Sequence, residues 1–322
     1  MNSVSVSAPG KIHLMGEHAV VYGKPALLSA INLRLTVTVE SMDSSQKKPV
    51  EIVCPEGEAF IRESVAVIQN ALHVTSNQPI RITVISNIPP GYHLGSSAAV
   101  AVALTGALMQ FYTNTFNKQK INEIAYEIEK IAHGTPSGGD NTTVAYGGLL
   151  WYRKETEFLK LFSPVSLPSL KQFRSLQNFF LIDTGRSKES TKEMVSSVKQ
   201  LFEKNPQVKK HVLDANEEAV KKAAEALVHT DESSLIQALQ LGEQTLEAMQ
   251  VVSAKIIPFI REIENRGGAA KILGGGGKSD RAGYLLCYHP HVKNVQKISE
   301  KYGYSVQAIQ LGEEGVRLEK TR

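Results

Sequence analysis

The first half of the chain alternates apolar and polar residues in several short segments. The alternation is clear in VSVSAP, LRLTVTVES, PVEIVC and IRITVIS, which occupy residues 4–9, 33–41, 49–54 and 80–86. A period of two places alternate side chains on opposite faces of an extended chain. The pattern therefore predicts β-strands in these four segments.

Two other segments of the first half repeat apolar residues at helical spacing. EAFIRESVAVIQNAL covers residues 58–72, and KINEIAYEIEKIAHG covers residues 120–134. The second segment ends on Gly134, a residue type that often closes helices because it readily adopts left-handed backbone angles. Strand-like pieces follow between Leu149 and Phe162, so the first half reads as strands with interspersed helices.

The stretch NIPPGYHLGSSAAVAVALTGALMQFY places flexible residues directly before an apolar helix. Its two prolines cannot continue the preceding strand because they lack an amide hydrogen. Gly91 and Gly95 permit backbone angles that a side chain disfavours, and Ser96 and Ser97 fall where a helix N-cap is expected. Free amides at the positive end of the helix then predict an anion site, although an ordinary capped helix after a turn explains this stretch alone equally well.

The second half is predicted to be a helical block framed by strands. A proline-containing segment from Ser163 to Phe173 precedes it and is a candidate linker, and the helical block runs from about Ser190 to Arg266. The other predicted elements are the strands NFFLIDTG (178–185), AAKILG (269–274), GYLLCYH (283–289) and YSVQAIQL (304–311), and the helix HVKNVQKISEKYG (291–303). This order predicts an α+β fold with helices packed on one face of an antiparallel sheet.

Composition narrows the functional classes. The chain has 322 residues, enough for about two domains, with 42% hydrophobic and 21% charged residues, as in ordinary globular proteins. A net charge of +4 without a dense basic tract argues against nucleic acid as a partner, but leaves room for local anion sites. Cys54 and Cys287 are too few for a disulfide framework or a zinc site. Without a signal-like N-terminus or an apolar run long enough to span a bilayer, we expect a cytoplasmic protein with no membrane association.

Two further segments carry candidate chemistry. SAPGKIHLMGEHAVVYGKPAL contains Lys11 after a Pro-Gly step, and then the neighbouring Glu17 and His18. EIEKIAHGTPSGGDNTTVAYGG places Asp140 and Asn141 after a Pro-Ser-Gly-Gly loop that follows a helix. Taken one at a time, each segment is more readily explained as turn or surface structure than as a catalytic site.

Together and in this order, the segments resemble the signature motifs of the GHMP kinase family. APGKIHLMGEHAVVYGKPAL is similar to the first motif, PPGYHLGSSAA to the phosphate-binding second motif, and HGTPSGGDN to the segment that carries the catalytic aspartate. A glycine-rich third motif lies near KILGGGG, so the resemblance covers the chain from end to end. The GEHAVVYG part favours the branch of the family that phosphorylates mevalonate over the branch that phosphorylates galactose.

The resemblance implies a fold and an activity. The fold is a two-domain α+β GHMP kinase fold, with a domain like domain 2 of ribosomal protein S5 over residues 1–165 and a ferredoxin-like domain over residues 166–322. The activity is the ATP-dependent phosphorylation of (R)-mevalonate at its 5-hydroxyl, giving 5-phosphomevalonate for isoprenoid synthesis. A kinase for another small alcohol such as phosphomevalonate, and a non-catalytic sensor of nucleotide and metabolite, are the alternatives. A homodimer stays open.

The resemblance also assigns roles to residues. Asp140 matches the catalytic aspartate that takes or orients the proton of the substrate hydroxyl, and Lys11 matches the lysine that holds this aspartate ionised. Ser97 and Glu129 match the ligands of Mg²⁺, a cation that prefers oxygen donors. The residues implied to hold the ATP phosphates are Pro90, Gly91, Gly95, Ser96, Ser97 and Ala98. Those implied to contact mevalonate are Glu17, His18, Thr143 and Tyr146.

Two departures from the family pattern stand out. The second motif has His93 where glycine is usual, so an imidazole could narrow the nucleotide site, hydrogen-bond a phosphate, or point into solvent. The third motif is followed by the charged insert Lys278 to Arg281 before the next strand. This insert either alters nucleotide or inhibitor binding or forms an exposed turn.

Overall fold

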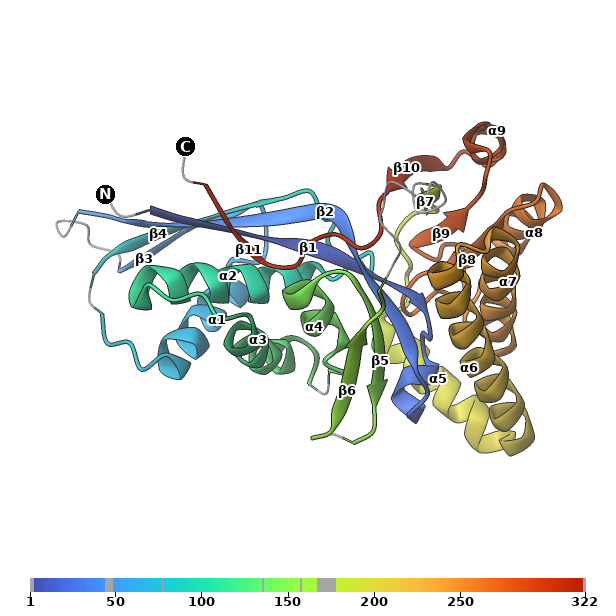
Figure 1. Ribbon diagram of the computed structural model, residues 1–322, viewed down its shortest axis with the longest axis horizontal. Coiled ribbons are helices and arrows are strands. Elements are labelled where there is room, and N and C mark those ends of the chain that lie inside the picture. The colour runs from blue at the N-terminus through green and yellow to red at the C-terminus, as the bar shows by residue number, and fades with distance from the viewer. Residues whose placement is uncertain are drawn as a thin grey trace.

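The chain folds into two halves that lie side by side (Figure 1). The computed structural model describes residues 3–43, 49–76, 78–134, 136–156, 158–166 and 178–320. The elements of the first half are β1 (Ser3–Met15), η1 (Ala19–Tyr22), β2 (Ala26–Ser41), β3 (Val50–Val53), α1 (Glu58–Ala71), β4 (Ile80–Ser86), α2 (Ser96–Thr113), α3 (Lys118–His133), α4 (Gly139–Tyr146), β5 (Leu149–Lys154) and β6 (Lys160–Pro164). Those of the second half are β7 (Phe179–Asp183), α5 (Thr191–Lys204), α6 (Pro206–His229), α7 (Glu232–Ala248), α8 (Ile257–Asn265), β8 (Ala269–Ile272), β9 (Tyr284–Tyr288), α9 (Val292–Tyr302), β10 (Ser305–Ile309) and β11 (Arg317–Glu319).

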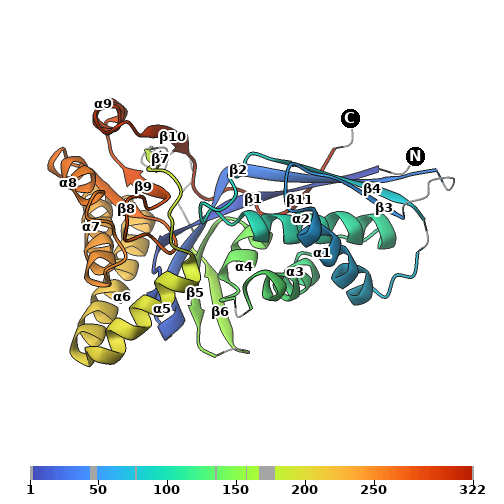
Figure 2. The same ribbon diagram turned by 180° about the vertical axis from the view of Figure 1, so that it is seen from behind.

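The first half is a mixed sheet covered by helices on one face (Figures 1 and 2). Its strand order is β11-β1-β2-β4-β3, and β5 and β6 extend from β2 as a hairpin. The four strands predicted here are confirmed, but β1 is longer than the sequence indicated. It runs through the Pro9–Gly10 step to Met15, because the pairing with β2 absorbs that step as a shift in register instead of breaking there. This continuation carries Lys11 and His13 into the interior.

Helix α2 is apolar because it is the central buried helix of the first half. Ala98, Val102 and Leu108 are fully buried between the sheet and the helices α1 and α3. The predicted serine N-cap is wrong: the N-cap is Gly95, with φ of 75°, and Ser96 is already the first helical residue. A left-handed glycine at the cap turns the chain sharply, and therefore both serines enter the first turn of the helix.

The second half is a four-stranded antiparallel sheet in the order β10-β7-β9-β8, packed against helices. The predicted strands and the final helix α9 are confirmed, and the helical block resolves into α5 to α8. Cys287 is buried in this sheet and Cys54 is half-buried in the first half, and both are free thiols. Among the described residues, no helix has the length and apolar character needed to cross a membrane.

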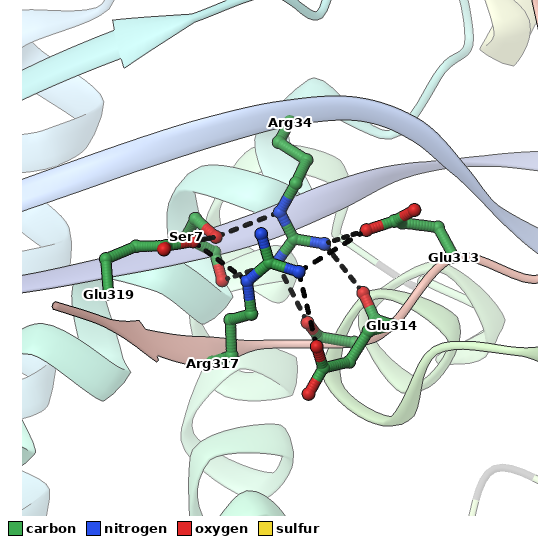
Figure 3. A network of polar contacts seen from close by, with 7 residues as sticks. Ser7, Arg34, Glu313, Glu314, Arg317 and Glu319 are labelled. Atoms are coloured by element: carbon green, nitrogen blue, oxygen red, sulfur yellow. Dashed lines mark hydrogen bonds and ion pairs between the residues drawn. The ribbon is translucent and has the colours of Figure 1, made fainter.

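The C-terminal segment returns to the first half, which the sequence did not predict. Strand β11 pairs with β1, with Ser5 opposite Glu319. Figure 3 shows how Arg34 of β2 ties this segment down: its guanidinium donates to Ser7 Oγ at 2.9 Å and to the Glu313 carboxylate at 2.9 Å. It also donates to the backbone oxygens of Glu314 and Gly315 at 2.7 and 3.0 Å. The two ends of the chain therefore belong to one sheet.

The predicted division at residue 165 stays a prediction. Most of the candidate linker, residues 167–173, lies outside the described residues. Because residues 317–319 complete the first sheet, the first half is not formed from one continuous stretch of chain.

Candidate active site

A deep cleft of about 1850 Å³ lies where the two halves meet. Its floor and one wall come from the first half: β1, the loop before α2, and the start of α4. The other wall comes from the second half, through residues 186–192 with Val195, and through Gly274 and Gly275. The sequence-predicted residues that line it are Lys11, Glu17, His18, Pro90, Gly91, Gly95, Ser96, Ser97, Glu129 and Asp140.

Lys11 and Asp140 form an ion pair at the centre of this cleft. Lys11 Nζ lies 2.8 Å from Asp140 Oδ2, and His13 Nε2 lies 3.6 Å from the other carboxylate oxygen. Asp140 stands in the first turn of α4, directly after the Pro-Ser-Gly-Gly loop. Burial opposes ionisation of this carboxyl, but the Lys11 charge and the His13 contact outweigh it, and the pKa of Asp140 is lowered. The carboxylate is therefore ionised and poised beside a cation.

Ser97 and Glu129 meet on the other side of Asp140. Glu129 comes from α3, is 2% exposed, and its carboxyl accepts a hydrogen bond from Ser97. Burial, together with the nearby negative charge of Asp140, raises the pKa of Glu129 to about 7. Ionising a buried carboxyl next to a second carboxylate is costly. A cation bound between them would compensate both negative charges and is therefore favourable. One hydroxyl and one carboxylate are also the kind of oxygen donors that suit Mg²⁺.

The loop before α2 is held close to Lys11, and this explains two of its glycines. The Lys11 amide donates to Leu94 O at 2.9 Å. A Cβ on Gly95 would lie 2.7 Å from Lys11 Cγ, and one on Gly91 would lie 2.8 Å from a guanidinium nitrogen of Arg186. Both glycines also have positive φ angles. Side chains here would displace the two cations, so glycine is required at both positions.

Glu17 and His18 form a buried turn that lines the cleft. His18 has a left-handed backbone, with φ of 57°, and its Nε2 lies 3.2 Å from Gly275 O. Burial lowers the pKa of His18, so the ring is neutral at pH 7. The Glu17 carboxylate makes an ion pair with Lys271 of β8. Both predicted substrate residues thus face the cleft but are anchored to the second half.

Three predicted residues do not reach the cleft. Thr143 is fully buried, and its hydroxyl donates to Gly139 O at 2.8 Å within α4. Tyr146 packs its ring against Phe162 of β6, with centroids 5.1 Å apart. Ala98 is buried in the core under the first turn of α2. Because α4 begins at Gly139, its helical geometry brings Asp140 to the cleft and carries Thr143 and Tyr146 away from it.

The sequence did not reveal several residues that line the cleft. Arg186, Lys188 and Lys192 bring positive charge from the segment between β7 and α5. The run TGRSKESTK, a glycine followed by three cations, was the available signal for them. The apolar end of the cleft is lined by Leu35, Pro55, Phe60, Ile61, Val84, Ile88 and Pro89. These residues come from separate elements and carry no shared pattern in the sequence.

The two departures from the family pattern lie in different environments. His93 is half-buried in the cleft wall: its Nδ1 lies 3.3 Å from Thr191 Oγ1, and its ring abuts Gly274. Burial and the Lys11 charge lower the pKa of His93 to about 4. The insert after the third motif is an exposed turn outside the cleft lining, where Asp280 pairs with Lys255 and Lys188. The exposed-turn interpretation therefore describes the insert and not the histidine.

Comparison with known proteins places this site in a class. Residues 59–148 match the family described as GHMP kinases N terminal domain, the region that holds the phosphate loop, Glu129 and Asp140. The fold is that of a GHMP kinase. The chain is 31% identical to the mevalonate kinase of Pyrococcus abyssi over 99% of its own length and 98% of that protein. It is 33% identical to the mevalonate kinase of Archaeoglobus fulgidus over 84% of this chain and 88% of that one. The chain belongs to the mevalonate kinase family.

Solved structures agree on the fold. L. major mevalonate kinase in complex with R-mevalonate has a TM-score of 0.80 at 21% identity, covering 98% of this chain and 97% of that one. Mevalonate kinase from methicillin-resistant Staphylococcus aureus has a TM-score of 0.67 at 26% identity, covering 97% of this chain and all of the other. The phosphomevalonate kinase of Streptococcus pneumoniae has a TM-score of 0.74 at 17% identity, covering 97% and 100%. Because the sequence identities to the L. major and S. pneumoniae proteins are low, these two similarities support the fold alone.

Proposed function

We propose that this chain transfers the γ-phosphoryl group of ATP to the 5-hydroxyl of (R)-mevalonate. The observation that carries the proposal is the Lys11–Asp140 pair, 2.8 Å apart in a cleft walled by a glycine-rich helix N-terminus. Family membership supports both the reaction and the substrate. The product is 5-phosphomevalonate, and the second product is ADP.

The chemistry assigned to the chain is mainly positioning. The mevalonate 5-oxygen attacks the γ-phosphorus, the bond from that phosphorus to the β–γ bridging oxygen breaks, and ADP leaves with that oxygen. Asp140 orients the attacking hydroxyl and accepts its proton, because its lowered pKa keeps the carboxylate ionised until then. Lys11 keeps Asp140 ionised and stabilises negative charge on the moving group.

The phosphates of ATP are assigned to the loop before α2. Amides from Gly91 to Ser97 and the positive end of α2 are suited to bind anions. Arg186, which packs against Gly91, adds a cation from the second half. The apolar end of the cleft, with Phe60 among its lining residues, suits an uncharged planar base.

Ser97 and Glu129 are the residues that would hold Mg²⁺. The fit is supported by their oxygen donors and by the pKa of Glu129, which burial and the negative charge of Asp140 raise to about 7. When bound, the cation would neutralise phosphate charge. Glu129 would then bind the metal, and Asp140 would orient the hydroxyl.

Glu17 and His18 are proposed to form the mevalonate end of the cleft. Both line the cleft, and a neutral buried imidazole can hydrogen-bond a hydroxyl or a carboxylate. Thr143 and Tyr146 are not part of this proposal, since they lie outside the cleft lining. A cytoplasmic location and a homodimer stay predictions.

The decisive experiment is an assay with a panel of acceptors. Purified protein with ATP and Mg²⁺ should convert mevalonate to 5-phosphomevalonate, identified by mass spectrometry, and turn over galactose, homoserine and phosphomevalonate weakly or not at all. Equal or better turnover of phosphomevalonate would assign the other kinase. Binding of ATP and mevalonate without any product would assign a sensor.

A further inference from the structure

A buried ionic cluster lies directly behind the Glu17–His18 turn. It consists of Glu17 from the first half, Lys271 of β8 and Glu243 of α7, and each of the three is at most 1% exposed. Lys271 Nζ pairs with Glu17 Oε1 and donates to Ile272 O at 2.8 Å. Glu243 Oε2 accepts the Ile272 amide at 3.0 Å. The cluster thus joins the first half of the chain to two elements of the second.

The charge balance of the cluster favours a single tight pair. Burial raises the pKa of Glu243 well above its usual range, even though Lys271 lies nearby and opposes the shift. The neutral form of Glu243 is therefore favoured, and the Lys271 ammonium pairs with the Glu17 carboxylate. Moving one of two paired charges out of a buried site leaves the other uncompensated, which is strongly unfavourable. The Lys271 ammonium therefore fixes the position of the Glu17 carboxylate.

The segment 271–275 holds both residues of the turn. Lys271 holds Glu17, and four residues later Gly275 O lies 3.2 Å from His18 Nε2. His18 needs this support, because a left-handed backbone is unfavourable for a residue with a side chain and persists only where the surroundings impose it. Gly16, which precedes the turn, packs closely against β2, since a Cβ there would lie 2.6 Å from Ala26 Cα.

We propose that Lys271 is a positioning residue of the mevalonate site: its ion pair with Glu17 keeps the Glu17–His18 turn facing the substrate. This inference rests on the proposed function, because it takes mevalonate to bind beside His18. Lys271 does not line the cleft, so it acts through Glu17 and not on the substrate itself.

The test compares Lys271→Met and Glu17→Gln with wild type by steady-state kinetics on both substrates. Each variant should raise the KM for mevalonate by roughly 10- to 100-fold, the cost of misplacing a binding group by about an ångström. The KM for ATP should stay within about twofold, because the phosphate loop is anchored separately through Lys11 and Leu94. The double variant should be no worse than Lys271→Met alone, since both changes break one pair.

Lys301→Met is the matched control, because it removes an exposed lysine whose Nζ lies 2.6 Å from a Glu262 carboxylate oxygen. It should leave both KM values unchanged. If Lys271→Met does not fold, as judged by circular dichroism, the double variant removes both buried charges and takes its place. Folded variants with an unchanged KM for mevalonate, or with equal rises for both substrates, would overturn the proposal. Absence of mevalonate turnover in wild type would instead defeat the proposed function.

Discussion

Lys11 and Asp140 are 129 positions apart in the chain, yet Lys11 Nζ lies 2.8 Å from Asp140 Oδ2. Strand β1 brings the lysine, and the first turn of α4 brings the aspartate. Because the pair is at the centre of the cleft, its two members can be separated experimentally into a proton acceptor and a charge stabiliser.

Asp140→Asn preserves the shape of the side chain but removes the proton acceptor. We expect kcat to fall by roughly 10²–10⁴, the usual contribution of general base catalysis. ATP binding should stay within a few-fold, because the phosphates are assigned to the Gly91–Ser97 loop. The measurement is the single-turnover rate at saturating ATP and mevalonate, which excludes product release. A variant that keeps a tenth or more of the wild-type rate would show that Lys11, more than Asp140, activates the hydroxyl.

Lys11→Met should also lower kcat, and it should weaken ATP binding as well, since it removes a cation beside the phosphate loop. Combined with Asp140→Asn, it should cost less than the sum of the two separate losses in activation free energy, because the two residues act as a unit. Strictly additive losses would contradict this coupling. An equilibrium titration with nucleotide measures the change in ATP affinity.

Glu129→Gln and Ser97→Ala should differ in their demand for magnesium. The first removes a charged ligand and the second a neutral one, and a dication loses more attraction with the charged ligand. Magnesium titrations of activity should therefore shift further for Glu129→Gln. Glu127→Gln, which neutralises an exposed carboxylate on the same helix α3 outside the cleft lining, is the control. Identical titrations for the wild type and both variants would reject the assignment.

His93→Gly should raise the KM for ATP and leave that for mevalonate nearly unchanged, because the imidazole belongs to the phosphate loop and abuts Gly274. The pKa of His93 is lowered to about 4, so the ring is neutral from pH 6 to 8. The KM for ATP should therefore show no step from this residue in that range. Thr191→Val, which loses only the hydroxyl 3.3 Å from Nδ1, separates the hydrogen bond from the packing. An unchanged KM for ATP in His93→Gly would remove the residue from the nucleotide site.

Glu243→Gln should make the free energy of unfolding less dependent on pH. The pKa of Glu243 is raised in the folded protein, so the neutral form is favoured there. Above the ordinary carboxyl pKa of 4.5, the unfolded chain releases this proton and the folded chain retains it; the free energy of unfolding therefore falls as pH rises. Lys271, Glu17 and Glu247 are the charges that act on it. The free energies of unfolding of wild type and variant, measured with urea from pH 5 to 8, should converge at the acid end of this range. A constant difference between them from pH 5 to 8 would contradict the assignment.

Arg34→Met should destabilise the protein by roughly 1–3 kcal/mol, because several buried hydrogen-bond acceptors in the network of Figure 3 would lose their donor. Arg62→Met, which removes an exposed pair with Glu58 on α1, should change stability by no more than about 0.5 kcal/mol. Denaturant unfolding measures both. Equal, small losses would mean that the C-terminal segment is held by its strand pairing alone.

Local patterns in the sequence were enough for the strands and helices whose apolar periodicity spans several residues. Helix α1 and strand β4 are examples, because each buries one face and therefore repeats apolar residues at its own period. The left-handed cap at Gly95 was missed because serine is the stronger cap by composition, while the real constraint is the approach of Lys11.

The parts of the site that depend on distant contacts could not be predicted. Resemblance to a family indicated Lys11, Glu129 and Asp140, and the structure places them in one cleft. It gave no reason to join Glu17 to Lys271, since 254 positions separate them and each charge alone is typical of a solvated surface. The resemblance also assigned Thr143 to the pocket, and the structure buries it within helix α4.

The placement of β11 also has a consequence during synthesis. Strand β1 is synthesised before β11, so the edge of the first sheet stays open until residues 317–319 have been made. Until then, Arg34 lacks Glu313 and the carbonyls of Glu314 and Gly315, and the exposed edge of β1 offers unpaired amides to any neighbouring strand. The nascent chain therefore depends on β11, the last strand in chain order among the described residues, to close the sheet to which β1 belongs.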